Sequence, residues 1–471
     1  MVTASAELAK SPEAMRALSA AGMDVLRING AHDSPEVWRA LAASARAAAA
    51  ATGRACRILV DLAGPKVRTG AIEPGPRVIS WHPKRDARGA VPVPVRVWIG
   101  AGPAPSSADL SLPLADGALT SVRAGDLVRI EEVRGRRRDL PVLAATWDGI
   151  LVTSDRSAWI APGAKVHRLV DGALAEALGV VGDLPALPGG VRLSIGDTLV
   201  VTRDPAPGRG ARDGAAATVP CTLPEVFAAV RPGAPILFDD GRIEGVVDDV
   251  DAERLTVRIT RARRGGDRLA ADKGINLPET NLPVPALTAV DLLALDVVVG
   301  FADLIGLSFV RRPEDVHRLH EALAARGASS LGIVLKIETR LGFENLPALL
   351  LAAMRSPRVG VMIARGDLAV ECGFMRLAEV QEEILWICEA AHVPAIWATQ
   401  VLDTLARTGV ATRAEITDAA FGQRAECVML NKGPHAAEAV AVLGDILERM
   451  SAHQRKKSAM LRRLRSLAPG G

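Results

Sequence analysis

Polar and charged side chains follow the short apolar runs of this sequence, at the points where buried strands would end. One run ends in Lys336 and Glu338, and the next ends at Asp367. Because Lys336 and Glu338 are two residues apart, they face the same side of a strand. Two carboxylates beside a cation suit Mg²⁺ and a phosphorylated substrate, since Mg²⁺ takes few oxygens from a protein and shares others with phosphate and water. A purely structural ion pair is the alternative.

The other apolar runs end in a similar mixture of acids, amides and cations. No glycine-rich loop of the P-loop or protein-kinase type occurs in the sequence, so those two nucleotide-binding folds are not supported. The further strand-end groups are Arg27, Asn29 and His32; Asp61 with Lys66 and Arg68 close behind it; Ser308 and Arg311; Arg365 before Asp367; Thr399 and Gln400; and Asn431 and Lys432.

The apolar runs alternate with helix-like segments, a pattern typical of βα units around a parallel sheet. Eight strands, each followed by a helix, predict a (β/α)8 TIM barrel, with a doubly wound sheet as the competing fold. In such a barrel the active site forms at the carboxyl ends of the strands. The expected strands are 2–3, 25–29, 57–61, 304–309, 332–338, 359–364, 393–399 and 426–431.

A section rich in Gly, Pro and Arg interrupts the barrel pattern after the third strand. Its alternating runs, such as Leu127-Val128-Arg129-Ile130, and its Gly-Asp turns predict a large all-β insertion. The expected domains are residues 1–70 (barrel, first part), 71–273 (inserted β-rich domain), 274–450 (barrel, second part) and 451–471 (basic C-terminal tail).

Composition and charge exclude several classes of function. The 57 basic and 54 acidic residues leave a formal net charge of +3, which gives no support to nucleic-acid binding as the main role. Five scattered cysteines without a CxxC pair indicate buried thiols in a reducing compartment. The longest apolar stretch is broken by Asp296 and Asp303, and no signal peptide is visible, so we expect a cytoplasmic protein outside the membrane.

Nine segments closely resemble, in the same order, the successive motifs of the pyruvate kinase family. They are GMDVLRINGAHD, VDLAGPKVRTG, ILFDDGRI, KGINLP, GLSFVRRPEDV, VLKIETRLGFENL, VMIARGDLAVECG, WATQVLDTL and TRAEITDAA. The resemblance implies that phosphoenolpyruvate and ADP give pyruvate and ATP, and that the insertion is a lid domain. It implies small-molecule substrates as the partners and leaves a homo-oligomer open.

The resemblance also implies roles for the residues that match the family's motifs. Lys336 would stabilise the transferring phosphoryl group, and Arg27 would hold the phosphate. Glu338 and Asp367 would bind the divalent metal, Mg²⁺ or Mn²⁺. Such a site fits phosphoryl transfer, which needs positioning and charge neutralisation rather than a protein nucleophile.

The same motifs imply where the rest of the substrates would lie. Backbone amides around Gly366 and Asp367, together with the Thr399 hydroxyl, would receive the substrate carboxylate. Thr399 would also lie near the route by which the enolate is protonated. The nucleotide would be faced by three strand-end residues: His32, Arg68 and Asn29.

The sequence departs from the family at the site of the monovalent cation. Asn29, Asp61 and the Leu62 carbonyl remain as residual ligands, but Ala31 stands where the family usually has Ser. Lys66 stands where potassium-dependent members usually carry Glu, and its ammonium could supply the missing charge. We therefore expect activity without K⁺.

Further departures concern the last strand, the insertion and the C-terminus. Asn431-Lys432-Gly433 replaces the family's usual residues there, which leaves contacts with ADP at that corner open. The insertion is larger than usual, and we expect the family's C-terminal regulatory domain to be absent. Two other functions compete with a kinase: a Mg²⁺-dependent lyase or aldolase acting on pyruvate-like enolates, and a catalytically impaired, phosphoenolpyruvate-binding regulatory protein.

Overall fold

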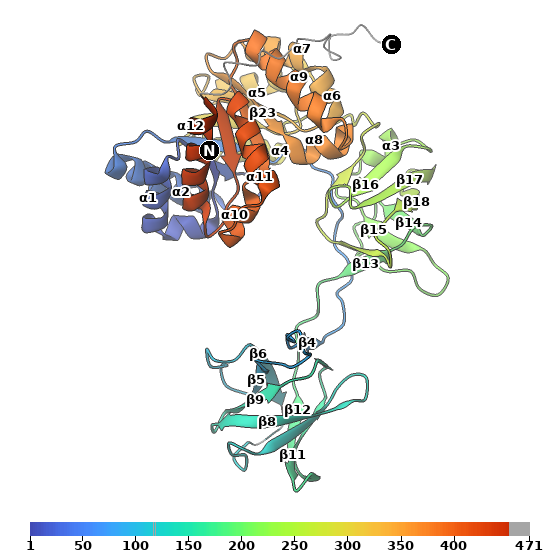
Figure 1. Cartoon of the computed structure of the whole chain (residues 1–471). Helices are drawn as coiled ribbons and strands as arrows, with labels where there is room; N and C mark the ends of the chain where they lie inside the picture. Colours follow the sequence, from blue (N-terminus) through green and yellow to red (C-terminus); the bar gives the residue numbers. More distant parts are fainter. Residues whose placement is uncertain (116, 118, 452–471) are drawn as a thin grey trace. The chain divides into compact units, whose positions relative to one another are not determined.

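A closed barrel of eight parallel strands forms the main body of the computed structural model, which describes residues 1–115, 117 and 119–451 (Figure 1). The barrel closes because β1 pairs with β25 as well as with β2. The predicted TIM barrel is therefore confirmed, and the doubly wound alternative is excluded. The barrel strands are β1 (Val2–Thr3), β2 (Val25–Asn29), β3 (Arg57–Asp61), β21 (Leu304–Leu307), β22 (Gly332–Ile337), β23 (Val359–Ala364), β24 (Ala395–Val401) and β25 (Cys427–Leu430).

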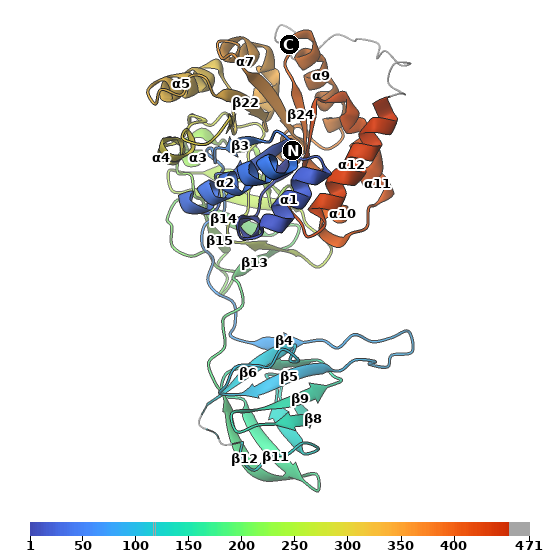
Figure 2. The ribbon, with the colours of Figure 1, turned by 90° about the vertical axis from the view of Figure 1, so that its left-hand side faces the viewer.

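Helices surround the strands, and the ring of helices closes where the last helix packs against the first (Figure 2). Their starts carry local signals: Thr288 and Asp291 form a capping box at α4, and Thr412 and Glu415 form one at α11. The helices are α1 (Pro12–Ala21), α2 (Pro35–Thr52), α4 (Ala289–Val298), α5 (Pro313–Ala324), α6 (Arg340–Glu344), α7 (Leu346–Ala353), α8 (Arg365–Cys372), α9 (Leu377–Ala390), α10 (Asp403–Thr408), α11 (Arg413–Phe421) and α12 (Ala436–Ser451), with 3-10 turns η1 (Ala6–Lys10) and η2 (Gly422–Arg424).

The alternation of side chains along the strands decides which residues enter the barrel. On β22, Leu335 and Ile337 pack in the large core that the strands share with the helices. Val334 packs instead with Met362 of β23 in a separate cluster of strand residues. Since side chains alternate with period two, Lys336 lies on the same side as Val334, inside the barrel.

The insertion between β3 and β21 folds into two β structures. Residues Ile72–Gly190 form a compact unit of their own, with a closed barrel of strands in the order β11-β12-β6-β5-β9-β8-β7. The following six-stranded sheet, ordered β15-β14-β18-β17-β16-β20, belongs to the same compact unit as the TIM barrel. The short helix α3 (Val226–Ala229) accompanies it. The predicted β-rich insertion after the third strand is thus confirmed.

The strands of the insertion are β4 (Ile79–Trp81), β5 (Val95–Gly100), β6 (Leu110–Ala115), β7 (Leu127–Glu131), β8 (Arg137–Ala145), β9 (Gly149–Ser154), β10 (Ala158–Ile160), β11 (Lys165–Val170), β12 (Ala173–Val181), β13 (Gly190–Leu193), β14 (Thr198–Thr202), β15 (Ala217–Pro220), β16 (Pro235–Phe238), β17 (Ile243–Val250), β18 (Arg254–Arg261), β19 (Asp267–Ala270) and β20 (Ile275–Asn276). The domain boundaries expected at residues 70 and 273 stay a prediction. Apart from Ser451, the predicted basic tail lies outside the described residues. Among the described residues, no helix has both the length and the apolarity to cross a membrane.

Candidate active site

Lys336 is the centre of a buried polar network at the carboxyl ends of the barrel strands. Only 7% of the residue is exposed. Its Nζ donates to the Ser308 hydroxyl at 2.6 Å and lies 3.1 Å from Glu338 Oε1 and 3.2 Å from Asp61 Oδ2. Asp61 Oδ2 also accepts from Arg27 Nε at 2.8 Å, and Arg27 Nη2 lies 2.7 Å from it. Four strands, β2, β3, β21 and β22, therefore bring their end groups together.

Burial and charge oppose each other within this network. Burial on its own would raise the pKa of Asp61, but the charges of Arg27 and Lys336 outweigh it and lower that pKa. Burial would lower the pKa of Lys336, but Asp61 and Glu338 reverse the effect and raise it. Asp61 and Lys336 are therefore charged at neutral pH. An ammonium held in this way is suited to binding a phosphate group.

Glu338 differs from Asp61 because its pKa is raised rather than lowered. Burial raises the pKa of Glu338, and the charge of Asp367 raises it further, although Lys336 acts in the opposite direction. One carboxylate oxygen, Oε2, accepts from the backbone N–H of Phe309 at 2.6 Å. Phe309 has a left-handed φ of 53°, and this turn ends β21 at Leu307, two residues before the end that the sequence predicts.

The two carboxylates of Glu338 and Asp367 fit the donor set of a divalent cation. Burial is the main cause of the raised pKa of Glu338, and the charge of Asp367 adds to it, so a nearby divalent cation would favour both carboxylates. Two protein carboxylates are a usual number for Mg²⁺, with water and phosphate oxygens as further ligands. Within the described residues, no three His, Cys, Asp or Glu side chains gather to hold a metal.

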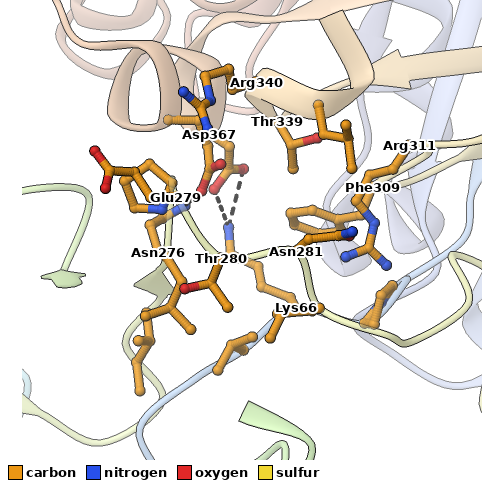
Figure 3. Close-up of a pocket in the computed structure, with 18 of the residues that line it drawn as sticks. Lys66, Asn276, Glu279, Thr280, Asn281, Phe309, Arg311, Thr339, Arg340 and Asp367 are labelled. Carbon is orange, nitrogen blue, oxygen red and sulfur yellow. Dashed lines mark hydrogen bonds and ion pairs between the residues drawn. The ribbon is translucent and has the colours of Figure 1, made fainter. Parts of the chain in front are cut away.

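Lys66 pairs with Asp367 across 301 residues of sequence. Its Nζ lies 2.9 Å from Asp367 Oδ1 and 3.2 Å from Oδ2, and the two side chains point toward each other (Figure 3). The ammonium also lies 5.8 Å from the centre of the Phe309 ring. Lys66 thus neutralises Asp367 rather than contacting the residual ligands of the monovalent site.

Two of the three residual ligands, Asn29 and Leu62, already accept hydrogen bonds from the protein itself. The Asn29 side-chain oxygen accepts from the Ala31 N–H at 3.2 Å, and the Leu62 carbonyl accepts from the Ser308 hydroxyl at 2.6 Å. Asp61 Oδ1 is buried without a hydrogen-bond partner in the described residues and lies against the backbone of Gly306. Of these three oxygens, only Asp61 Oδ1 has no hydrogen-bond partner within the described residues.

The first turn of α8 and the end of β24 meet at Thr399. The Gly366 N–H donates to the Thr399 hydroxyl at 2.9 Å, and Gly366 is exposed at the start of the helix. The sequence predicts the strand before Arg365 but not this helix. An exposed helix N-terminus attracts carboxylates because its N–H groups are unpaired and its dipole is positive there.

A cavity of about 140 Å³ opens beside Lys66 and Asp367 (Figure 3). Its walls include two residues that the sequence does not single out, Asn276 and Glu371, joined by a hydrogen bond of 3.1 Å. Burial raises the pKa of Glu371, and the Asp367 charge adds to this rise. Asn276 lies in the KGINLP motif and Glu371 in VMIARGDLAVECG, so the motifs themselves contain the signal.

The expected nucleotide-facing residues lie outside the Lys336 network. Arg68 donates to the Asp272 carbonyl at 3.0 Å, which ties it to the insertion. His32 is exposed, and its carbonyl accepts from Trp38 Nε1 at 2.8 Å. At the corner that departs from the family, Asn431 Nδ2 donates to Asp403 of α10 at 2.8 Å.

Comparison with known proteins matches this chain to one family. The family model described as "Pyruvate kinase, barrel domain" covers residues 2–86 and 186–440. A pyruvate kinase of Methylorubrum extorquens is 34% identical over 265 residues, which cover 55% of this chain and 52% of the relative. One from Bacillus licheniformis is 33% identical over 270 residues, covering 55% and 44%. Pyruvate kinase 1 of Trypanosoma brucei brucei is 34% identical over 266 residues, covering 55% and 51%. The chain thus spans about half the length of these relatives.

Proposed function

This chain belongs to the pyruvate kinase family, and we propose that it transfers a phosphoryl group from phosphoenolpyruvate to ADP, giving pyruvate and ATP. One observation carries the proposal: the protonated Lys336 and the carboxylates of Glu338 and Asp367 gather where the barrel strands end. Phosphoryl transfer needs groups that position the reactants and neutralise charge, and this cluster supplies both.

Each residue of the cluster has a defined part in the proposed reaction. Lys336 would donate hydrogen bonds to the phosphoryl group in transit, and Arg27 would hold its oxygens before transfer. Bound Mg²⁺ (or Mn²⁺), held by Glu338 and Asp367, would neutralise the phosphate charge. No side chain has to act as a nucleophile, because ADP attacks the phosphorus directly.

The carboxylate of phosphoenolpyruvate would lie at the start of α8. The Thr399 hydroxyl accepts from Gly366 and keeps its own proton to donate. That hydroxyl also lies where it could take part in protonating the enolate. His32, Arg68 and Asn29 would face the nucleotide, and closure of the lid would exclude water that could divert the phosphoryl group.

We propose further that turnover does not require K⁺. The residual ligands Asn29 and Leu62 already accept hydrogen bonds from the protein, and Lys66 brings a fixed positive charge beside Asp367. Initial rates in KCl and in NaCl at equal ionic strength should therefore agree within about twofold. A large stimulation by K⁺ would contradict this expectation.

The proposed activity is tested by following pyruvate and ATP together in a mixture of phosphoenolpyruvate, ADP and Mg²⁺. Equal amounts of both products are expected, and chelation of Mg²⁺ should abolish them. Pyruvate-like products from other substrates without any nucleotide would favour a lyase or aldolase. Calorimetric binding of phosphoenolpyruvate by a folded protein that forms no ATP would favour the regulatory function. Either result would overturn the kinase proposal.

A further inference from the structure

The chain leaves barrel strand β24 through residues with unusual backbone angles. Thr399 has a φ of 70°, Gln400 of 59° and Leu402 of 47°. The pairing of β24 with β25 also shifts in register between Trp397 and Val401. A left-handed φ is costly for a β-branched residue such as Thr, so the surrounding structure has to hold Thr399 in place.

Arg365 holds the two peptide groups around Thr399. Its Nε donates to the Ala398 carbonyl at 2.8 Å, and its Nη2 donates to the Thr399 carbonyl at 2.6 Å. The guanidinium also stacks over the Trp397 ring, 4.3 Å from the ring centre. These contacts fix the carbonyl before Thr399 and the carbonyl of Thr399 itself.

Asp418 of α11 fixes the guanidinium in turn. Its Oδ2 accepts from Arg365 Nη2 at 2.8 Å, and its Oδ1 accepts from Arg365 Nη1 and from Trp397 Nε1, the latter at 3.2 Å. Only 10% of the Arg365 side chain is exposed. Because its donors already serve protein acceptors, Arg365 is suited to positioning rather than to binding a ligand.

We propose that Arg365, held by Asp418, is a positioning residue that places the Thr399 hydroxyl for the substrate carboxylate. Arg365 is also the first residue of α8 and directly precedes Gly366. Its side-chain contacts with the end of β24 therefore hold the Gly366 N–H beside the Thr399 hydroxyl, to which that N–H donates. The inference rests on the proposed kinase function. It adds that the geometry of the carboxylate site depends on a half-buried ion pair that touches no substrate.

The test compares Arg365→Lys with Thr399→Ala and with the double variant. Lysine keeps the charge but cannot serve two carbonyls and a carboxylate together in this planar arrangement. We expect Arg365→Lys to lower kcat/KM for phosphoenolpyruvate about 30-fold, with the KM for ADP changed less than about twofold. In the Thr399→Ala background, the same substitution should cost less than about threefold, because Arg365 acts through Thr399.

The matched control is Arg326→Lys. Arg326 also serves two backbone carbonyls and a carboxylate, those of Ala322, Leu292 and Asp296. It lies in the connection from α5 to the start of β22, away from the carboxyl ends of the strands, so its replacement should leave kcat/KM within about twofold of wild type. A comparable loss in this variant would mean that general destabilisation explains the effect, and would overturn the proposal.

If Arg365→Lys fails to fold, Asp418→Asn takes its place in the same cycle, with a smaller loss in the same direction. If the losses of kcat/KM in the two single variants multiply fully in the double variant, Arg365 does not act through Thr399. That result would refute the positioning role and leave the proposed kinase function unaffected. A folded wild-type protein without pyruvate and ATP formation would refute the proposed function itself, so the two failures are distinguishable.

Discussion

Replacement of Lys336 by Met tests the centre of the site, because Met has a similar length and no charge. Two acidic partners of Lys336, Glu338 and Asp61, would lose a cation within 3.2 Å. Removing one partner of a buried ion pair costs about 3–5 kcal/mol of stability. We expect the lower end, about 3 kcal/mol, since Asp61 keeps Arg27 and Glu338 can take up a proton.

The effect on turnover should exceed the effect on stability. Loss of a cation that contacts a transferring phosphoryl group costs about 10³-fold or more in kcat, which corresponds to about 4 kcal/mol of transition-state stabilisation. The substitution should also lower the Tm by about 3–4 °C. Steady-state formation of pyruvate and ATP, followed at saturating Mg²⁺, measures the first quantity, and differential scanning calorimetry measures the second.

The difference in Tm between the wild type and Lys336→Met should depend on pH through the pKa of Lys336. That pKa is raised in the folded protein, so the stabilisation is fully present below the unfolded value of about 10.4 and is lost as the pH rises through the folded value. The difference in Tm should therefore persist from about pH 6 to 9. Lys165→Met, at an exposed lysine of the 72–190 unit, is the control and should change neither quantity. A Lys336→Met protein with more than about a tenth of wild-type kcat would refute the reasoning.

Three further predictions follow from separate parts of the molecule. Gly366→Ala should keep or raise the Tm, because the added Cβ would lie no closer than 3.8 Å to Thr399. The KM for phosphoenolpyruvate should rise about tenfold, because the methyl group crowds the carboxylate site. A lowered Tm would contradict this prediction. Replacing residues 78–185 with Asn-Gly should leave a folded protein, since Arg77 and Ala186 already pair as neighbours, and loss of soluble protein would count against it. Iodoacetamide at pH 8 should label the half-buried Cys427 before the buried thiols, because burial raises the pKa of Cys372 to about 12. Because the Cys372 pKa is raised in the folded protein, stability should fall as the pH rises above about 8.5, the pKa of an unfolded thiol. Labelling of Cys372 before Cys427 would refute this order of reactivity.

The sequence by itself determined the order of the elements and the edge at which the site forms. Alternation along a strand places Lys336 and Glu338 on one side, and this needs no knowledge of the rest of the chain. The parallel strand pattern predicts that all their ends meet at one rim, as they do. Local capping signals at Thr412 and at the first helical prolines likewise mark the helices, because each depends on residues within one turn.

Only the tertiary structure decided which of these end groups bind one another. The pairing of Lys66 with Asp367, and of Arg365 with Asp418, depends on the register in which the barrel closes, and no local pattern contains that register. The left-handed Thr399 could not be predicted either, because its intrinsic preference opposes the conformation that distant contacts impose. Long-range electrostatic and hydrogen-bond contacts outweigh local propensity at these points, and they are the points where the proposed chemistry takes place.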